Sequence, residues 1–348
     1  MGHIIYPPPL QPGDIIGITA PSAGFGPALE ARYQFAVRHL HNLGYRVKEG
    51  HCLRSPNEAM ASAPARERAA ELTEMLQDSS IAAVIPPWGG EILIDILPLL
   101  DFSMLSHCKP KWILGYSDLS TLMLPFTLLT HTATAHGSDL MEAPNIPPEQ
   151  LASWHDVMTL PAGRTFTQHP APRYQIDEYD WRMQPHVRTF NCTETANWKC
   201  LEHELDEGYE VTVSGRLLGG CLDVISMLPG TPYGDVNRFA DDAAPEGLLL
   251  YLENVDGNTA QYCRMLYAVR LSGWFEHANA LLVGRSAGAQ LREYTNHDVL
   301  NDALGGLHIP VIYDIDIGHR PPQLMLVNGA LASLHFKGQQ SELTQVLL

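Results

Sequence analysis

The sequence predicts an α/β protein: an N-terminal three-layer domain built on a parallel sheet, followed by a C-terminal mixed α/β domain. Two observations support this fold class. Short apolar runs alternate with longer runs of helical periodicity, which is typical of a parallel sheet covered on both faces. The chain has 348 residues, of which 45% are hydrophobic. A chain of this length and composition can bury more than one average core.

The first half supplies the elements of the expected parallel sheet. We expect strands at 15–20, from 45 to at least 47, and at 81–86, 112–116 and 132–136, with helices at 28–43, 58–77, 91–100 and 119–130. The last of these helices has Leu122, Met123, Phe126 and Leu129 at helical spacing. This half therefore reads as β-α-β-α alternation.

Regular periodicity fades between about residues 144 and 210, where prolines and aromatic residues replace it. We therefore expect an N-terminal domain over 1–165, a connecting loop region over 166–208 and a C-terminal domain over 209–348. In the last we expect strands at 209–218, 248–253, 280–283 and 311–317, helices at 221–228 and 258–272, and a terminal hairpin turning at Asn328-Gly329.

Composition excludes several classes of function. Lys and Arg number 22 against 39 Asp and Glu, a net charge of −17. A chain so acidic is repelled by nucleic acid and by anionic lipid, so neither is an expected partner. No apolar run is long enough to span a membrane and none resembles a secretion signal. The six cysteines are scattered without a C-x-x-C pair, which indicates reduced thiols in the cytoplasm.

The segment Gly115-Tyr116-Ser117-Asp118 is the first candidate for chemistry. An apolar strand runs into it and a helix begins at once. A serine at such a turn has its hydroxyl at the carboxyl edge of the sheet, beside helix-terminal N–H groups that can receive a developing oxyanion. The alternative is that Ser117 or Asp118 caps the helix, as these residue types commonly do.

Ser286 is a competing candidate. Gly284-Arg285-Ser286-Ala287-Gly288 matches the G-x-S-x-G pattern and also follows an apolar strand. Only about 60 residues follow it, whereas the hydrolases with this pattern place more strands and helices after the nucleophile. We therefore interpret Ser286 as a turn residue.

Glu253 and His319 each follow an apolar strand, at the place where the sites of α/β proteins assemble. A hydrolytic serine needs a base, and that base needs an orienting carboxylate. Glu253 is otherwise a turn carboxylate together with Asn254 and Asp256, and His319 otherwise a loop histidine before two prolines. Their joint occurrence with Ser117 favours the catalytic interpretation.

No pattern indicates a metal or an organic cofactor. The histidines lack zinc spacing, and no G-x-G-x-x-G or Walker sequence follows the first strand. Gly89-Gly90 also follows a strand. This diglycine is either a tight turn or a place where backbone N–H groups meet a substrate.

Several segments together resemble a known family. They are ITAPSAG, PPWGGE, LDF, LGYSDLSTLMLP, HGSDLM, SGRLLGGCLDVISMLPGTPYGD, LLYLENVDGN and DIDIGHRPPQ, in the family's order over nearly the whole chain. The sequence resembles the serine LD-carboxypeptidases of peptidoglycan recycling and their relatives, the microcin C self-immunity proteins. This resemblance implies Ser117 as nucleophile, His319 as base and Glu253 as its orienting carboxylate. It also implies an oxyanion hole made by Asp118 with Gly89 or Gly90, and a homodimer.

The chain departs from the carboxypeptidase members at Trp88-Gly89-Gly90-Glu91, where those members commonly have an Arg-Gly-Gly-Tyr-Gly-like segment. Its length and long middle connection look more like the immunity branch, in which a loop aromatic stacks on adenine. Trp181 and Trp198 lie in the corresponding stretch, and Glu91 joins them as an expected substrate contact.

We therefore expect a cytoplasmic serine hydrolase that cleaves an amide-type bond in an aminoacyl-nucleotide or peptide-nucleotide antibiotic. A muramoyl-tetrapeptide LD-carboxypeptidase is the enzymatic alternative. A protein that sequesters its ligand without turnover is the alternative of another class.

Overall fold

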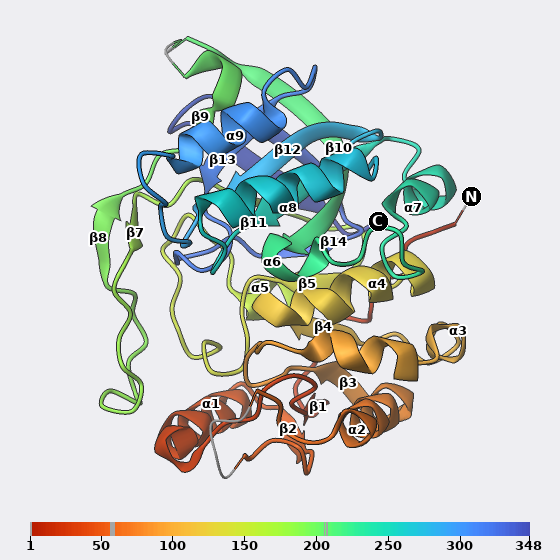
Figure 1. The fold of residues 1–348 in the computed structure, drawn as a ribbon. Helices are drawn as coiled ribbons and strands as arrows, with labels where there is room; N and C mark the ends of the chain where they lie inside the picture. The colour runs from red at the N-terminus through yellow and green to blue at the C-terminus, as the bar shows by residue number, and fades with distance from the viewer. Residues whose placement is uncertain (1, 56–59, 205, 207) are drawn as a thin grey trace.

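The computed structural model describes residues 2–55, 60–204, 206 and 208–348, which form three sheets with helices packed around them (Figure 1). A six-stranded sheet lies in the N-terminal half and an eight-stranded sheet in the C-terminal half, and the third sheet is a two-stranded hairpin. The α/β fold class is confirmed. The predicted boundaries at 165 and 208 stay predictions. Among these residues, no helix is both long and apolar enough to cross a membrane.

The six-stranded sheet has the order β14-β5-β4-β3-β1-β2. Its parallel strands are β1 (Ile15–Ile18), β2 (Arg46–Glu49), β3 (Ile81–Val84), β4 (Trp112–Gly115) and β5 (Thr134–His136), and β14 (Leu326–Asn328) joins β5 antiparallel. β4 is buried at every residue. A strand buried on both faces reads as a continuous apolar run, which is how the sequence signalled it.

The helices of this half are α1 (Glu30–Asn42), α2 (Ala65–Gln77), α3 (Phe102–Leu105) and α4 (Ser120–Thr130), with 3-10 turns at Pro27–Leu29, Leu93–Leu99 and Ser117–Leu119. The predicted helix at 91–100 is the second of these turns, and it contains Pro98, which has no N–H to donate. Residues 56–59, where one helix was expected to begin, lie outside the described residues. α4 is buried along nearly its whole length because it lies between the two large sheets (Figure 1).

The eight-stranded sheet has the order β6-β16-β15-β10-β11-β12-β13-β9. Its parallel centre is β10 (Val211–Cys221), β11 (Leu248–Glu253), β12 (Ala278–Gly284) and β13 (Val311–Ile315), flanked by antiparallel β6 (Thr165–Gln168), β9 (Lys199–Cys200), β15 (Leu331–Phe336) and β16 (Glu342–Val346). The helices here are α6 (Leu222–Ile225), α7 (Val236–Ala243), α8 (Thr259–Leu271) and α9 (Asn296–Leu304). The parallel centre brings the end of β11 and the loop after β13 to one edge.

The predicted terminal hairpin is wrong. β14 pairs with β5 in the first sheet, whereas β15 pairs with β10 in the second, so Asn328-Gly329 links two sheets. The buried Asn328 amide donates to Thr134 Oγ1, and its oxygen accepts from the Gly219 N–H and the Tyr251 hydroxyl. A turn does form at Asn328-Gly329, where the Ala330 N–H donates to the Val327 oxygen, but the Asn328 side chain binds both sheets and β14 and β15 do not pair with each other.

The middle connection is more ordered than expected. It contains α5 (Trp154–Met158) and a hairpin of β7 (Arg173–Gln175) and β8 (Cys192–Thr195), which stands beside the main body in green (Figure 1). It also contributes β6 and β9 to the eight-stranded sheet. These strands are too short for their alternation to be recognised in the sequence. β6 and β9 form by pairing with β16 and β13, which are distant along the chain.

Candidate active site

Ser117 occupies a strained turn between β4 and α4. Its φ is 61°, in the left-handed region that non-glycine residues rarely adopt. Such a conformation costs of order 1–3 kcal/mol and clusters at functional sites. Ser117 makes no side-chain cap at the 3-10 turn or at α4. The capping alternative therefore does not account for this serine.

Asp118 ties two loops to the same turn. Its carboxylate accepts hydrogen bonds from the Ser22 hydroxyl at 2.5 Å, the Leu93 N–H at 2.9 Å and the Thr121 hydroxyl at 3.2 Å. Ser22 follows β1 and Leu93 follows the diglycine, so one buried carboxylate fixes the surroundings of Ser117.

The diglycine packs directly against Ser117. A Cβ on Gly89 would lie 2.8 Å from the Ser117 Cβ and 3.0 Å from both Ser117 Oγ and the Asp118 nitrogen. Gly90 has φ 146°, and a Cβ there would overlap the Ser22 hydroxyl. Only glycine permits this approach of the backbone to the serine. The expected oxyanion-hole residues Asp118, Gly89 and Gly90 are thus brought together around Ser117.

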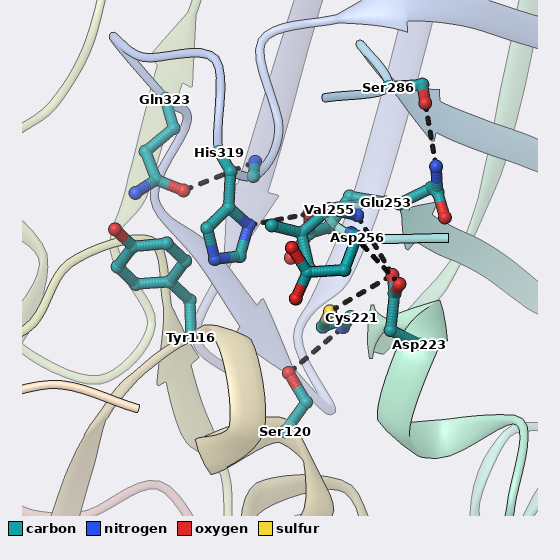
Figure 2. A network of polar contacts seen from close by, with 12 residues as sticks. Tyr116, Ser120, Cys221, Asp223, Glu253, Val255, Asp256, Ser286, His319 and Gln323 are labelled. Atoms are coloured by element: carbon teal, nitrogen blue, oxygen red, sulfur yellow. Dashed lines mark hydrogen bonds and ion pairs between the residues drawn. The ribbon is translucent and has the colours of Figure 1, made fainter. Parts of the chain in front are cut away.

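Glu253 and His319 form a buried pair at the edge of the second sheet (Figure 2). The Glu253 Oε2 to His319 Nδ1 distance is 2.9 Å, with side-chain exposures of 0% and 19%. Glu253 ends β11, and His319 lies in the loop after β13. Gly318, at φ 87°, lies so close to Glu253 that a Cβ would overlap its carboxylate. Glycine at position 318 therefore allows the chain to pass close to the carboxylate and to place His319 next to Glu253.

Electrostatics favour a charged state of this pair. Burial acts to raise the pKa of Glu253, but the charge and hydrogen bond of His319 outweigh it and the pKa is lowered. Burial acts to lower the pKa of His319, but the charge and hydrogen bond of Glu253 raise it above its ordinary value, with help from Glu142 and Glu178. Glu253 is thus an anion that stabilises an imidazolium.

Tyr116 connects the two halves of the site, because it directly precedes Ser117 and its ring centroid lies 4.9 Å from that of His319 (Figure 2). Its hydroxyl donates to Glu142 Oε1 at 3.0 Å. Burial raises the pKa of Glu142 to about 7, against the hydrogen bond from Tyr116, which lowers it. Sequence reasoning missed this pair. Glu142 follows the end of β5. It could have been found as Glu253 and His319 were, as a polar residue that comes after an apolar strand.

The segment after Glu253 is held by Asp223, whose carboxylate accepts from the N–H groups of Val255, Asp256 and Gly257 (Figure 2). Ser286 belongs to the same network. Its Oγ accepts from Asn254 Nδ2 at 2.7 Å and from the Gly288 N–H at 3.3 Å. These are the contacts of a turn residue.

A cavity of about 520 Å³ adjoins the diglycine. Trp88, Gly90, Glu91, Glu178, Tyr179 and Trp181 are among the residues that line it. Trp181 is half-buried, and the guanidinium of Arg32 lies 4.7 Å from its ring centroid. Two of the three expected substrate contacts, Glu91 and Trp181, therefore line one cavity, which adjoins the diglycine.

The prediction for Trp198 requires correction. Its side chain lies in the core of the eight-stranded sheet and is 2% exposed, and its indole N–H donates to Asp316 Oδ2 at 2.8 Å. This burial leaves no indole face for a substrate. Proximity in sequence to Trp181 does not place it in the same environment.

Arg32 is a buried residue that sequence reasoning missed. From α1 it donates to the backbone oxygens of Met141 and Val187 and to the side chain of Asn145. These contacts hold the segment that carries Trp181 against the N-terminal half. No sequence signal marks Arg32, because its partners lie more than a hundred residues away.

One cluster in the described ranges has metal-ligand chemistry: His51, Cys52 and Glu71, whose ligand atoms lie within 4.8 Å of one another. The Glu71 oxygens already accept from the Thr19 hydroxyl, the Cys52 N–H and the His51 ring. Glu71 thus acts as an acceptor that caps the loop after β2, and these contacts do not favour a metal.

Comparisons with known proteins find matches to both halves of the chain. The LD-carboxypeptidase N-terminal domain matches residues 16–137, and the LD-carboxypeptidase C-terminal domain matches residues 214–334. A putative carboxypeptidase of Vibrio cholerae is 27% identical, with 96% of each chain covered. The microcin C7 self-immunity protein MccF of Escherichia coli is 24% identical over 99% of this chain and 97% of its own. A probable murein peptide carboxypeptidase of Bacillus subtilis is 26% identical over 94% and 91%.

Solved structures share the fold. MccF in complex with aspartyl sulfamoyl adenosine superimposes with a TM-score of 0.81 at 21% identity, with 98% of each chain covered. A MccF-like protein of Streptococcus pneumoniae in complex with AMP gives 0.73 at 20% identity, over 96% of this chain and 98% of its own. The two domain matches together span well over half of the sequence. The chain therefore belongs to the LD-carboxypeptidase family.

Proposed function

We propose that this protein is a serine hydrolase that cleaves an amide-type bond, with Ser117 as nucleophile, His319 as general base and Glu253 as the carboxylate that orients it. Membership of a serine peptidase family supports the reaction class. The observation that carries the residue assignment is the buried Glu253–His319 pair lying against Tyr116, the neighbour of a strained Ser117.

The chemistry follows from the pair's orientation. With Nδ1–H donating to Glu253, Nε2 of His319 is the atom left to take the proton of Ser117 Oγ as the serine attacks the carbonyl carbon. The backbone N–H groups at Asp118 and the diglycine receive the oxyanion. His319 then returns the proton to the leaving nitrogen, and water hydrolyses the acyl-enzyme by the same route.

We propose an aminoacyl-nucleotide or peptide-nucleotide of the microcin C type as the substrate. Support comes from the full-length similarity to MccF and from the nucleotide and aminoacyl sulfamoyl ligands named for MccF and a MccF-like structure. In this chain Trp181 is the aromatic residue we assign to stacking on the base, because it lines the cavity that adjoins the diglycine.

The alternative enzyme is a muramoyl-tetrapeptide LD-carboxypeptidase. Two curated relatives favour it: the probable murein peptide carboxypeptidase of Bacillus subtilis, and the murein tetrapeptide carboxypeptidase of Pseudomonas aeruginosa, which is 23% identical over 73% of this chain and 72% of its own. Trp88 and Glu91 argue against this alternative, because neither side chain provides a cation that could bind the terminal carboxylate of the peptide substrate.

The deciding experiment incubates the purified protein with a muramoyl tetrapeptide and, separately, with a processed microcin C analogue, and follows both by mass spectrometry. We expect cleavage of the amide-type bond in the second compound. Cleavage of the tetrapeptide alone would establish the alternative enzyme. Stoichiometric binding of either compound without any product would establish a sequestering protein.

A further inference from the structure

The cavity beside the diglycine combines an aromatic wall with acidic groups. Trp88, Tyr179 and Trp181 supply the rings, and Glu91 and Glu178 supply the carboxylates. The Trp88 indole N–H donates to the backbone oxygen of Ala23 at 3.1 Å, which fixes its ring at the start of the diglycine. Gly90 lines the cavity, and its neighbour Gly89 packs against Ser117, so the cavity and the proposed nucleophile lie on either side of the diglycine.

Among the described residues, the charged groups that line this cavity are Glu91, Glu178 and the ion pair of Asp180 with Arg182. Within the part of the chain that the structure describes, Glu91 and Glu178 have no hydrogen-bonding or ion-pair partner. The nearby cation Arg182 is held by both oxygens of Asp180 at 2.9 and 3.0 Å. Arg32 directs its guanidinium to backbone oxygens and to Asn145, and contributes its flat face to the back of Trp181.

Other carboxylates add to the same field. Burial, followed by the charges of Asp256 and Asp118, raises the pKa of Glu91 above its ordinary value. The charge of Glu178 reaches the His319 imidazole and Glu142. A substrate group that enters here meets a negative potential from several directions, which repels a second carboxylate and attracts a cation.

We propose that this cavity selects substrates that carry a protonated amine, so that Glu91 and Glu178 are specificity-determining residues. This inference rests on the hydrolase function proposed above and specifies its substrate class: an aminoacyl or peptidyl compound with a basic side chain, in preference to an acidic one. The ammonium group pairs with the two carboxylates, and its carbon chain and charge lie against the rings of Trp88 and Tyr179, which attract cations through their faces and leave the Trp181 ring for the base.

The test compares three sulfamoyl adenosines that share the nucleoside and differ in the aminoacyl side chain: lysyl, norleucyl and glutamyl. Norleucine keeps the carbon chain of lysine and lacks the amine. We expect kcat/KM for the lysyl compound to exceed that for the norleucyl compound by about tenfold or more, mainly through KM, with the glutamyl compound poorest. A lysyl-to-norleucyl ratio near one, or a preference for the glutamyl compound, would overturn the inference.

Substitutions at the two carboxylates test whether they cause the preference for the lysyl compound. Glu91→Gln and Glu178→Gln each reduce the lysyl-to-norleucyl ratio, and the double variant brings it close to one. Glu293→Gln is the matched control, since Glu293 is an exposed carboxylate outside the cavity, and it keeps the wild-type ratio. A ratio that survives in the double variant would assign the selectivity to other residues and refute the proposal.

Failure of the proposed reaction is distinguishable from failure of this inference. If none of the three compounds is hydrolysed, calorimetric titration of each into the Ser117→Ala protein measures recognition alone. Tighter binding of the lysyl than of the norleucyl compound supports the selectivity while the aminoacyl-nucleotide hydrolase function fails. Equal binding, or no binding of any compound, overturns the selectivity as well.

Discussion

Two regions of this molecule place a serine in a turn directly after a buried parallel strand, and each has a histidine paired with a carboxylate nearby. Ser117 follows β4, with the Glu253–His319 pair at 0% and 19% side-chain exposure. Ser286 follows β12 and shares a polar cavity of about 410 Å³ with His297, which lies 3.0 Å from Glu204 at 43% and 33% exposure. By sequence pattern alone, Ser286 is the better match.

The two regions differ in strain and in burial. Ser117 has φ 61°, whereas Ser286 is absent from the non-glycine residues with positive φ in the described ranges. The Ser286 hydroxyl is engaged by Asn254 and by the Gly288 N–H. An exposed ion pair gains little from its charges, whereas a buried acid holds a histidine firmly. The environment of the partner residues, more than the motif around the serine, separates a candidate nucleophile from a turn.

The largest expected effect is at the two serines themselves. Ser117→Ala should lower turnover by about four orders of magnitude or more, because the attacking atom is lost, and adding His319→Ala should lower it little further, since the residues act as a unit. Ser286→Ala should change turnover by less than about threefold. Steady-state kinetics on the four proteins measures this. A large loss confined to Ser286→Ala would reverse the comparison.

The effect of the buried Glu253 carboxylate on His319 should be measurable in the pH dependence of kcat/KM. His319 must be neutral to act as a base, and its raised pKa places the acidic limb of kcat/KM above its ordinary value of 6.5. Activity should therefore rise with pH through that raised pKa. Glu253→Gln removes the anion, so the limb should move to lower pH while turnover falls by about a thousandfold or more. Glu204→Gln, at the exposed pair, should leave the limb in place.

A smaller effect separates the glycines of the two turns. Gly89→Ala places a methyl group 3.0 Å from Ser117 Oγ and should lower kcat by about tenfold or more. In Gly288→Ala the new methyl overlaps the Gly257 backbone and the Asn254 side chain. That variant should lose about 1–3 kcal/mol of stability, with kcat reduced less than in Gly89→Ala. Thermal melts paired with kinetics distinguish the two, and equal kcat losses would contradict the distinction.

The smallest effect concerns the two tryptophans. Trp181→Ala should raise KM for an aminoacyl-nucleotide by about tenfold, in line with the 1–3 kcal/mol of base stacking on aromatic rings. Trp198→Phe should leave KM unchanged and lower the melting temperature, because the buried Asp316 carboxylate loses a hydrogen bond. If the two variants have the same KM, Trp181 does not contact the base.

The sequence predicts Ser117, Glu253 and His319 as site residues because all three follow apolar strands, and strand ends converge at one sheet edge in α/β proteins. The structure pairs Glu253 with His319 and packs the His319 ring against Tyr116, and the roles of the three residues stay predictions. Local sequence patterns gave wrong predictions where contacts between distant parts of the chain determine the structure. Asn328-Gly329 has hairpin chemistry, yet its strands enter different sheets. Trp198 is in a loop-like stretch, yet pairing of β9 with β13 draws it into the core. Arg32 reaches partners that no periodicity links to it.

The most direct test of the central claim, that Ser117 is the nucleophile, is covalent labelling with a fluorophosphonate probe, followed by peptide mapping. We expect a single labelled peptide that contains Ser117, with labelling strongly reduced in His319→Ala and retained in Ser286→Ala. Labelling at Ser286, or no labelling of the folded protein at either serine, would contradict the assignment of Ser117 as the nucleophile.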